Sequence, residues 1–342
     1  MTIEILQLLW YMVVGAAVIF YVMLDGFDLG VGSIHYFART DRDRRIFLNS
    51  IGPFWDGNEV WLVVIGGALF VGFPEVYAVS FSGFYTMLMI LLAGIIARVC
   101  GIEFRSKHES LIWRALWDGV FCFSSIAMTF GIGILLGNLV QGVPIDSNRE
   151  LYFSFWALFT PYTIGIGLLS IALFAMHGNN FLMMKTEGKL QNSLRKKAPF
   201  FILTFTLILI IMTLWTWKAH SYMVVRYLEY PFFCIAPILF VVLLILMTKA
   251  LQKFKYGLAF VYSMLSIAFL FSLFSLGTFP NLMISSIDKE LYSLTLFNSS
   301  SSQTTLEVAC TIAVIGLPLV LAYGFCLYYI FHGKTTLHDH SY

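Results

Sequence analysis

The sequence predicts an all-α integral membrane protein with about nine transmembrane helices. Hydrophobic residues make up 59% of the 342 residues and charged residues only 12%, whereas soluble domains are roughly a quarter charged. The apolar residues form long runs, and a run of about 20 such residues is enough to cross a bilayer as a helix. The uneven distribution of Lys and Arg between the loops also favours an odd number of spans.

Recognisable breaks bound the predicted spans. The first run lacks the basic segment of a cleaved signal peptide and is too long for one, so we expect a retained helix. The second carries Pro53 in its first turn, where a missing N–H costs nothing, and the turn Phe73-Pro74-Glu75 separates it from the third. The longest polar connection is 281–304. The nine predicted spans are 5–35, 51–73, 76–101, 113–140, 152–178, 198–220, 229–250, 256–280 and 305–332.

The basic residues predict the orientation of the chain. Of the 21 Lys and Arg residues, sixteen fall in loops on one side of the predicted membrane and four on the other, while Arg98 lies inside a helix. Cytoplasmic loops carry the excess of positive charge. We therefore expect the N-terminus outside and the C-terminus inside. Nothing in the charge pattern indicates nucleic-acid binding.

Six charged residues lie three or more residues inside the ends of the predicted spans, and all fall within the first 118 residues of the chain. A charge at the bilayer centre costs at least about 2.5–3.5 kcal/mol, so such residues mark functional sites by default. The pairs at 25 and 28 and at 56 and 59 are each three residues apart and share a helix face. All six are expected between the cytoplasmic surface and the membrane centre. They are Asp25, Asp28, Asp56, Glu59, Arg98 and Asp118.

These charges indicate either a proton path or a cation site. Five ionised carboxylates in a low-dielectric bundle would repel one another, and Arg98 carries the charge to balance only one of them. The structural alternative is that the charges form Arg–Asp pairs and helix caps. That alternative has most weight for Arg98 and Asp118, which lie near helix ends.

Other kinds of site have little support in the sequence. The seven histidines are expected near helix ends, in loops or in the tail, so no haem ligand pair is apparent. The five cysteines stand apart in apolar runs and indicate no disulfide or metal site. No phosphate-binding or nucleophile motif is present. The chain alone therefore does not resemble a complete enzyme, and no catalytic residue is predicted in it.

Several motifs resemble subunit II of cytochrome bd quinol oxidases. The segment 24–32, LDGFDLGVG, is similar to the first-helix signature of this family, and 49–62, NSIGPFWDGNEVWL, is similar to its second-helix signature. Shorter matches follow in the family's order as far as Pro144. The W-D-G-N-x-V-W-L run is the most specific of them. The resemblance covers nearly the whole chain but is dense only in the first 144 residues.

The resemblance implies a fold and a division of labour. It implies two four-helix bundles and a ninth, peripheral helix, which we divide as 1–145 for the first bundle, 146–280 for the second, and 281–342 for the outer loop, ninth helix and tail. It implies a haem-bearing subunit I with two haems b and one haem d, small accessory subunits, and a membrane quinol as electron donor. Some relatives hold a quinone in subunit II, so a quinone is possible here, although its binding residues are unknown.

The resemblance also assigns residues to a proton path. The family takes up protons from the cytoplasm at the position of Asp56, and Trp61 and Glu103 match residues on the same route. Our main hypothesis is a haem-free subunit that conducts protons from Asp56 to Glu59 and Asp25, next to Asp28. Arg98 and Asp118 would be charge partners. The alternatives are a proton- or cation-coupled transporter subunit and a purely structural assembly subunit.

Overall fold

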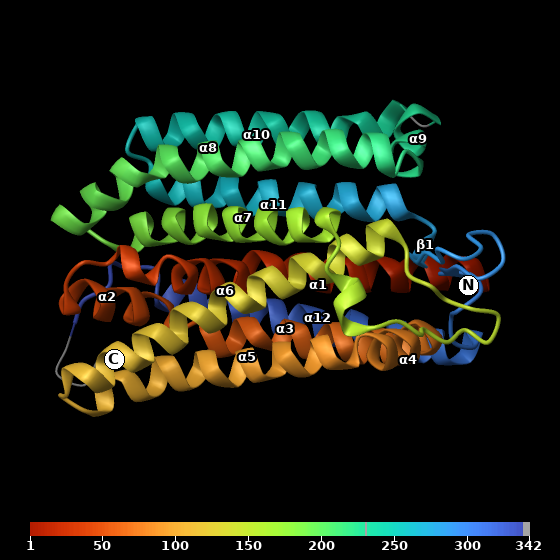
Figure 1. Cartoon of the computed structure of the whole chain (residues 1–342), viewed down its shortest axis with the longest axis horizontal. Helices are drawn as coiled ribbons and strands as arrows, with labels where there is room; N and C mark the ends of the chain where they lie inside the picture. The colour runs from red at the N-terminus through yellow and green to blue at the C-terminus, as the bar shows by residue number, and fades with distance from the viewer. Residues whose placement is uncertain (230, 338–342) are drawn as a thin grey trace.

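In a computed structural model, which describes residues 1–229 and 231–337, most helices run along the long axis of the molecule (Figure 1). The first half contains α1 (Ile3–Ser33), η1 (His35–Phe37), α2 (Asp41–Ile51), α3 (Trp55–Gly72), α4 (Pro74–Gly83), α5 (Tyr85–Phe104), η2 (Arg105–Lys107) and α6 (Leu111–Gln141). The second half contains η3 (Phe155–Leu158), α7 (Pro161–Lys185), α8 (Gly188–Ala219), α9 (Tyr222–Glu229), η4 (Pro231–Cys234), α10 (Ile235–Gln252), α11 (Tyr256–Thr278), β1 (Asn281–Met283), β2 (Leu294–Thr295) and α12 (Gln303–Ile330).

The predicted all-α membrane fold is confirmed. Within the described residues, eight helices are long and apolar enough to cross a membrane, and the bent pair α2 and α3 can supply a ninth span. The division at residues 145 and 280 stays a prediction, and the last five residues of the predicted tail, 338–342, lie outside the described residues.

The second predicted span differs from the structure. In place of one helix over 51–73, α2 and α3 meet at an angle of 47°. Residues 52–54, which include Pro53, form the turn between them. The hydropathy rule missed α2 because this helix begins with a charged stretch, and Thr40 caps it by accepting a hydrogen bond from the Asp43 N–H. The bend places the polar α2 beside the end of the bundle.

Three later boundaries are also wrong. The span predicted at 152–178 begins only at Pro161, because Thr160 caps α7 by accepting from the Thr163 N–H. The span predicted at 198–220 begins ten residues earlier, at Gly188. Its first turns are basic and therefore resemble a polar loop in the sequence. The span predicted at 229–250 is α10, which follows the short turn η4.

Helix α1 lies at the centre of the packing. It contacts α3, α6, α7, α11 and α12. Gly30 on α1 and Gly178 on α7 allow the closest approach: a Cβ added to Gly30 would stand 1.9 Å from the Phe174 carbonyl oxygen, and one added to Gly178 would stand 2.5 Å from the Gly30 backbone. Small residues let helix backbones approach in this way. The polar side chains of α1 thus lie deep inside the protein.

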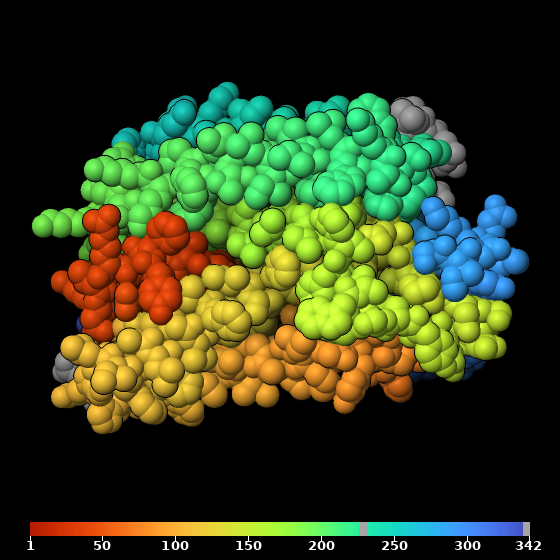
Figure 2. Space-filling model, in the orientation of Figure 1, coloured from red at the N-terminus to blue at the C-terminus, as the bar shows by residue number. Residues whose placement is uncertain are grey.

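The β-hairpin and the loops after α6 close one end of the molecule, the end that holds the N-terminus (Figure 1). Segments 142–160 and 281–302 lie together on this end in the space-filling view (Figure 2). The Val143 N–H donates to the Ile284 carbonyl at 2.9 Å, and the Ser301 N–H donates to the Gly72 carbonyl at 2.9 Å. Backbone hydrogen bonds between segments therefore hold this end together, and its two strands, β1 and β2, pair antiparallel.

At the opposite end, two lysines hold the C-terminal turns of α7 and α12 together. Lys185 Nζ donates to the carbonyls of Phe331 and Gly333 after α12. Lys334 Nζ donates to the carbonyls of Met184 and Thr186, at 2.7 and 2.9 Å. Each lysine thus satisfies carbonyls that the other helix leaves without an intrahelical partner. We call this pair the lysine clasp.

Candidate functional site

Arg98 joins two acidic side chains from two other helices. Its Nη1 lies 2.7 Å from Asp25 Oδ1 on α1, and its Nη2 donates to Glu59 on α3. The side chains of Arg98 and Asp25 are 0% exposed, and that of Glu59 is 17% exposed. Arg98 precedes the end of α5 by six residues, about 9 Å along the helix. It therefore pairs with two carboxyl groups, although its single charge balances only one.

Asp28, one turn along α1 from Asp25, is held by a second chain of contacts. Asn58 Nδ2 donates to Asp28 Oδ2 at 2.7 Å and to the Leu24 carbonyl at 3.1 Å. The Tyr328 hydroxyl, on α12, donates to Asn58 Oδ1 at 2.9 Å. Together with the three residues above, these side chains form the Arg98 cluster, which is Asp25, Asp28, Asn58, Glu59, Arg98 and Tyr328.

Two carboxyl oxygens of the Arg98 cluster have no hydrogen-bond partner among the described residues. They are Asp25 Oδ2 and Asp28 Oδ1, and both atoms are buried. A buried carboxylate oxygen without a donor is costly, and a proton on that oxygen reduces the cost. One guanidinium also faces three carboxyl groups, so full ionisation would leave two uncompensated negative charges. The cluster is therefore built to hold at least one proton or another cation.

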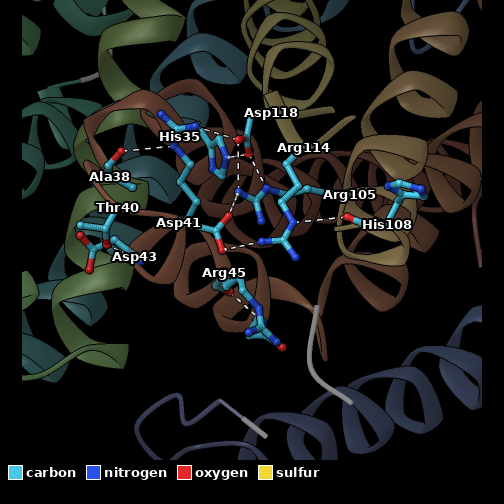
Figure 3. A network of polar contacts seen from close by, with 12 residues as sticks. His35, Ala38, Thr40, Asp41, Asp43, Arg45, Arg105, His108, Arg114 and Asp118 are labelled. Carbon is cyan, nitrogen blue, oxygen red and sulfur yellow. Dashed lines mark hydrogen bonds and ion pairs between the residues drawn. The ribbon is translucent and has the colours of Figure 1, made fainter. Parts of the chain in front are cut away.

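A second cluster of charges surrounds Asp118, near the start of α6 (Figure 3). Asp118 Oδ1 accepts from Arg105 Nε at 2.5 Å and lies 2.6 Å from His35 Nε2, and Asp118 Oδ2 accepts from Arg44 at 2.8 Å. Asp41 accepts from Arg105 at 2.8 Å and from Arg114 at 3.1 Å. These six residues form the Asp118 cluster. It ties η1, α2, η2 and α6 together.

Charge compensation distinguishes the two clusters. Asp118 has two arginines and a histidine around one buried carboxylate, so its charge is fully matched. Burial lowers the pKa of His35 from its ordinary value of 6.5, although the hydrogen bond and charge of Asp118 act in the opposite direction. The Asp118 cluster therefore has the character of a structural ion network, in contrast to the undercompensated Arg98 cluster.

The remaining predicted site residues lie around these clusters. Asp56, in the first turn of α3, is exposed on the surface of the chain, one turn before Glu59. Trp61 is buried and its ring stacks on Phe20, with the centroids 4.6 Å apart. Glu103 is half-buried near the end of α5. Asp118, the other residue predicted as a charge partner, pairs with Arg44 and Arg105.

Sequence reasoning missed the uncharged members of the Arg98 cluster and most of the Asp118 cluster. Asn58 lies within the second-helix motif, two residues after Asp56 and one before Glu59. This position next to the acids is the only sequence feature that could have indicated a role in the site. Tyr328 is one of 17 tyrosines and carries no signal. Arg44 and Arg105 lie between predicted spans, where Lys and Arg normally report only the orientation of the chain.

Buried His177 is engaged inside the protein. Its Nε2 lies 3.0 Å from the Met23 carbonyl oxygen on α1, and its Nδ1 lies 2.8 Å from Ser263 Oγ on α11. Both ring nitrogens are thus taken up by contacts between helices. Within the described ranges, no group of three or more His, Cys, Asp or Glu side chains is arranged to hold a metal ion.

The fold and the clusters define a polytopic α-helical membrane protein with a buried ionisable site near one end of its helices. The model of one family, the cytochrome bd terminal oxidase subunit II, matches residues 6–331. The chain belongs to this family, as the resemblance predicted. It is accordingly a subunit of a cytochrome bd quinol oxidase complex, an oxidoreductase.

Relatives and a solved structure agree. The chain is 34% identical to cytochrome bd-I ubiquinol oxidase subunit 2 of Escherichia coli K12, over 98% of this chain and 97% of the relative. It is 31% identical to cytochrome bd ubiquinol oxidase subunit 2 of Bacillus subtilis, over 96% of each chain. A chain of the bd oxidase structure from Geobacillus thermodenitrificans matches with a TM-score of 0.79 and 17% identity, over 95% of this chain and 98% of that one, and shares the fold.

Proposed function

We propose that this chain supplies a proton-uptake path from the cytoplasm, and a scaffold, to a haem-bearing subunit I that oxidises membrane quinol and reduces O2 to water. Reduction of O2 to water consumes protons as well as electrons. The haems expected in the partner subunit, two b and one d, supply the electron transfer and O2 chemistry. The residues of this chain would then hold and move protons. Small accessory subunits are further expected partners.

The observation that carries this proposal is the undercompensated Arg98 cluster. Asp25 Oδ2 and Asp28 Oδ1 are buried carboxyl oxygens without donors among the described side chains, and each is a place where a proton can reside. Glu59 is the half-buried member, since its side chain keeps 17% exposure. In the proposed path, Glu59 connects the exposed Asp56 with the fully buried Asp25 and Asp28.

The proposed order of steps follows the exposure of these groups. Asp56 receives a proton at the surface of α3, Glu59 accepts it one turn further along the helix, and Asp25 and Asp28 hold it inside the bundle. The positive charge of Arg98 stabilises the ionised form of the carboxyl groups, so they can release the proton again. Trp61 shields the inner part of the path through its stack on Phe20, and Glu103 flanks it on α5.

The proposed orientation is N-terminus outside and C-terminus inside, in a bacterial cytoplasmic membrane. The basic Asp118 cluster and the lysine clasp lie at the end of the bundle opposite to the β-hairpin, as an inside position requires. The Asp118 cluster would then be the scaffold element at the cytoplasmic surface. Family membership favours the oxidase subunit over the transporter alternative, since no relative described above is a transporter.

The test is the purified complex of this chain with its haem-bearing subunit, reconstituted in vesicles. Asp25→Asn and Glu59→Gln should slow quinol oxidase turnover at least tenfold, about 1.4 kcal/mol, while the haem absorption spectrum is retained. Glu75→Gln is the matched control, because Glu75 pairs with Arg149 at the other end and is 45% exposed. Full turnover of Asp25→Asn and Glu59→Gln with intact haems would refute the proton path.

A bound quinone is a second candidate for one part of the chain. A cavity of about 560 Å³ lies among α6, α7, α8, α9 and α11, lined mainly by apolar side chains that include Met212, Met223 and Phe271. Tyr162 and Tyr227 are among the residues that line it. Such a cavity suits an apolar cofactor with a few polar atoms. Organic extraction of the purified complex, with Met212→Trp as the filled-cavity variant, would show whether quinone is held here.

A further inference from the structure

Tyr328 is a polar residue that faces inward near the end of α12, a helix whose residues are mostly exposed or half-buried. Of the described residues of α12, only Leu306 and Ala309 are buried, and both lie in its first two turns. Nineteen residues after Ala309, the Tyr328 ring stacks on Phe54, with the centroids 4.7 Å apart and the planes 20° apart. Its hydroxyl reaches Asn58 at 2.9 Å. The ring and the hydroxyl therefore have separate partners.

The hydroxyl contact is one of three that hold the Asn58 amide in place. Nδ2 has two donors, and both are used, one on Asp28 Oδ2 and one on the Leu24 carbonyl. Oδ1 is an acceptor, so it needs a donor, and the Tyr328 hydroxyl supplies it. With the amide turned around, a carbonyl oxygen would face the Asp28 carboxylate and the two would repel. Asp28 and the Leu24 carbonyl, which both accept, thus select the orientation of the amide, and the Tyr328 hydroxyl holds the amide in place by donating to Oδ1.

The lysine clasp holds Tyr328 at this position. Lys185 bonds the carbonyls of Phe331 and Gly333 directly after α12, and its Nζ also lies 4.8 Å from the centre of the Phe54 ring. The Thr335 N–H donates to the Lys185 carbonyl at 2.8 Å. The end of α12 is therefore fixed against α7 on one side and against Phe54 on the other.

We propose that Tyr328 is a positioning residue for proton transfer at Asp28, acting through Asn58. This inference rests on the proposed proton path. With Nδ2 donating to Oδ2, the ionised form of Asp28 is stabilised and the exchangeable proton is confined to Oδ1, the oxygen without a partner among the described residues. Without the hydroxyl, Asn58 Oδ1 loses the Tyr328 donor and the amide is held less firmly against Asp28. Weaker donation to Oδ2 then favours the protonated carboxyl group. Asp28 then holds its proton too tightly to pass it on.

Tyr328→Phe in the purified complex tests this, because it removes the hydroxyl and keeps the stack on Phe54. Turnover should fall about two- to tenfold, the range that the loss of one hydrogen bond gives, and the acid limb of the pH profile should move to higher pH. Among the described residues, the charged or titratable groups facing Asp28 are Asp25, Glu59 and Arg98, from α1, α3 and α5, and Tyr328 itself, from α12. The first three are unchanged in the variant. Tyr329→Phe is the matched control, since Tyr329 is 68% exposed on the same turn.

A double-mutant cycle separates positioning from general stability. Asn58→Leu alone should lower turnover, and adding Tyr328→Phe to it should have no further effect, because the tyrosine acts through the amide. Additive losses, or an unchanged pH profile in Tyr328→Phe, would overturn the inference. If Asn58→Leu does not assemble, the pH profile of Tyr328→Phe alone decides.

Asp28→Asn distinguishes this inference from the proton path on which it rests. Normal turnover of Asp28→Asn would remove Asp28 from the path and the inference with it. Slow turnover of Asp28→Asn combined with normal turnover and pH profile of Tyr328→Phe would overturn the positioning role alone.

Discussion

Arg98 on α5 and Asp25 on α1 form an ion pair of 2.7 Å in which both side chains are fully buried, 73 residues apart in the sequence. Two charges placed so far from water stabilise a structure only when each has its partner. The pair therefore binds α5 to α1 and also fixes how much negative charge the site can carry.

Arg98→Gln should be severely destabilising, because it leaves Asp25 and Glu59 without their cation. Removal of one partner of a buried pair costs about 3–5 kcal/mol. The unfolding temperature of the purified complex measures this effect. Arg149→Gln, which breaks the exposed pair with Glu75, should cost no more than about 1 kcal/mol. Equal losses for the two variants would contradict the burial argument.

Asp118→Asn should reduce assembly more than catalysis. The change removes the charge that Arg44, Arg105 and His35 share, so the contact between η1, α2 and α6 weakens. The amount of haem-containing complex in membranes should fall, while turnover per haem in the complex that forms should stay near normal. Asp56→Asn, at an exposed position, should leave the amount of complex unchanged. A loss of turnover per haem in Asp118→Asn would place this residue in the proton path.

The stability of the complex should fall in mildly acidic solution because of His35. Its pKa is lowered in the folded protein by burial, whereas Asp118 raises it and Arg44 and Arg105 lower it. The unfolded chain therefore takes up this proton at a higher pH than the folded one. The stabilisation is complete above about pH 6.5, the ordinary value for histidine, and is lost as the pH falls below it. His35→Gln keeps a donor for Asp118 without this titration, so its unfolding temperature should depend less on pH between about 7 and 5.

Gly30→Ala should separate α1 from α7. The added Cβ would stand 1.9 Å from the Phe174 carbonyl oxygen and 2.9 Å from the Gly178 nitrogen, and both are backbone atoms that cannot rotate away. Overpacking of this kind costs about 1–3 kcal/mol. Gly15→Ala on the same helix is the control, because nothing lies within 4 Å of its added Cβ. Unfolding temperatures of the two variants in the complex test the difference, and equal values would show that α1 is free to shift.

The sequence predicted the Arg98 cluster better than its surroundings. Asp25, Glu59 and Arg98 stood out because a charge in an apolar run is costly wherever the helix packs. Asn58 and Tyr328 carry no such cost, so only the packing of α12 against α3 shows their role. Arg44 and Arg105 lie in two polar connections, where Lys and Arg normally report orientation. Only the structure shows that both reach Asp118. The predicted first residue of a helix was wrong where the first turns are polar, as at Lys189 in α8.

The reciprocal contacts of Lys185 and Lys334 have a consequence for how the protein is made. Chains are synthesised from the N-terminus, so α1, α3 and α7 enter the membrane before α12 exists. Until Lys334 arrives, the carbonyls of Met184 and Thr186 lack this partner, and Asn58 lacks the Tyr328 hydroxyl. A chain that stops before α12 would hold Asp25, Asp28, Glu59 and Arg98 but could not fix the Asn58 amide. Completion of synthesis is thus itself the step that finishes the acidic site.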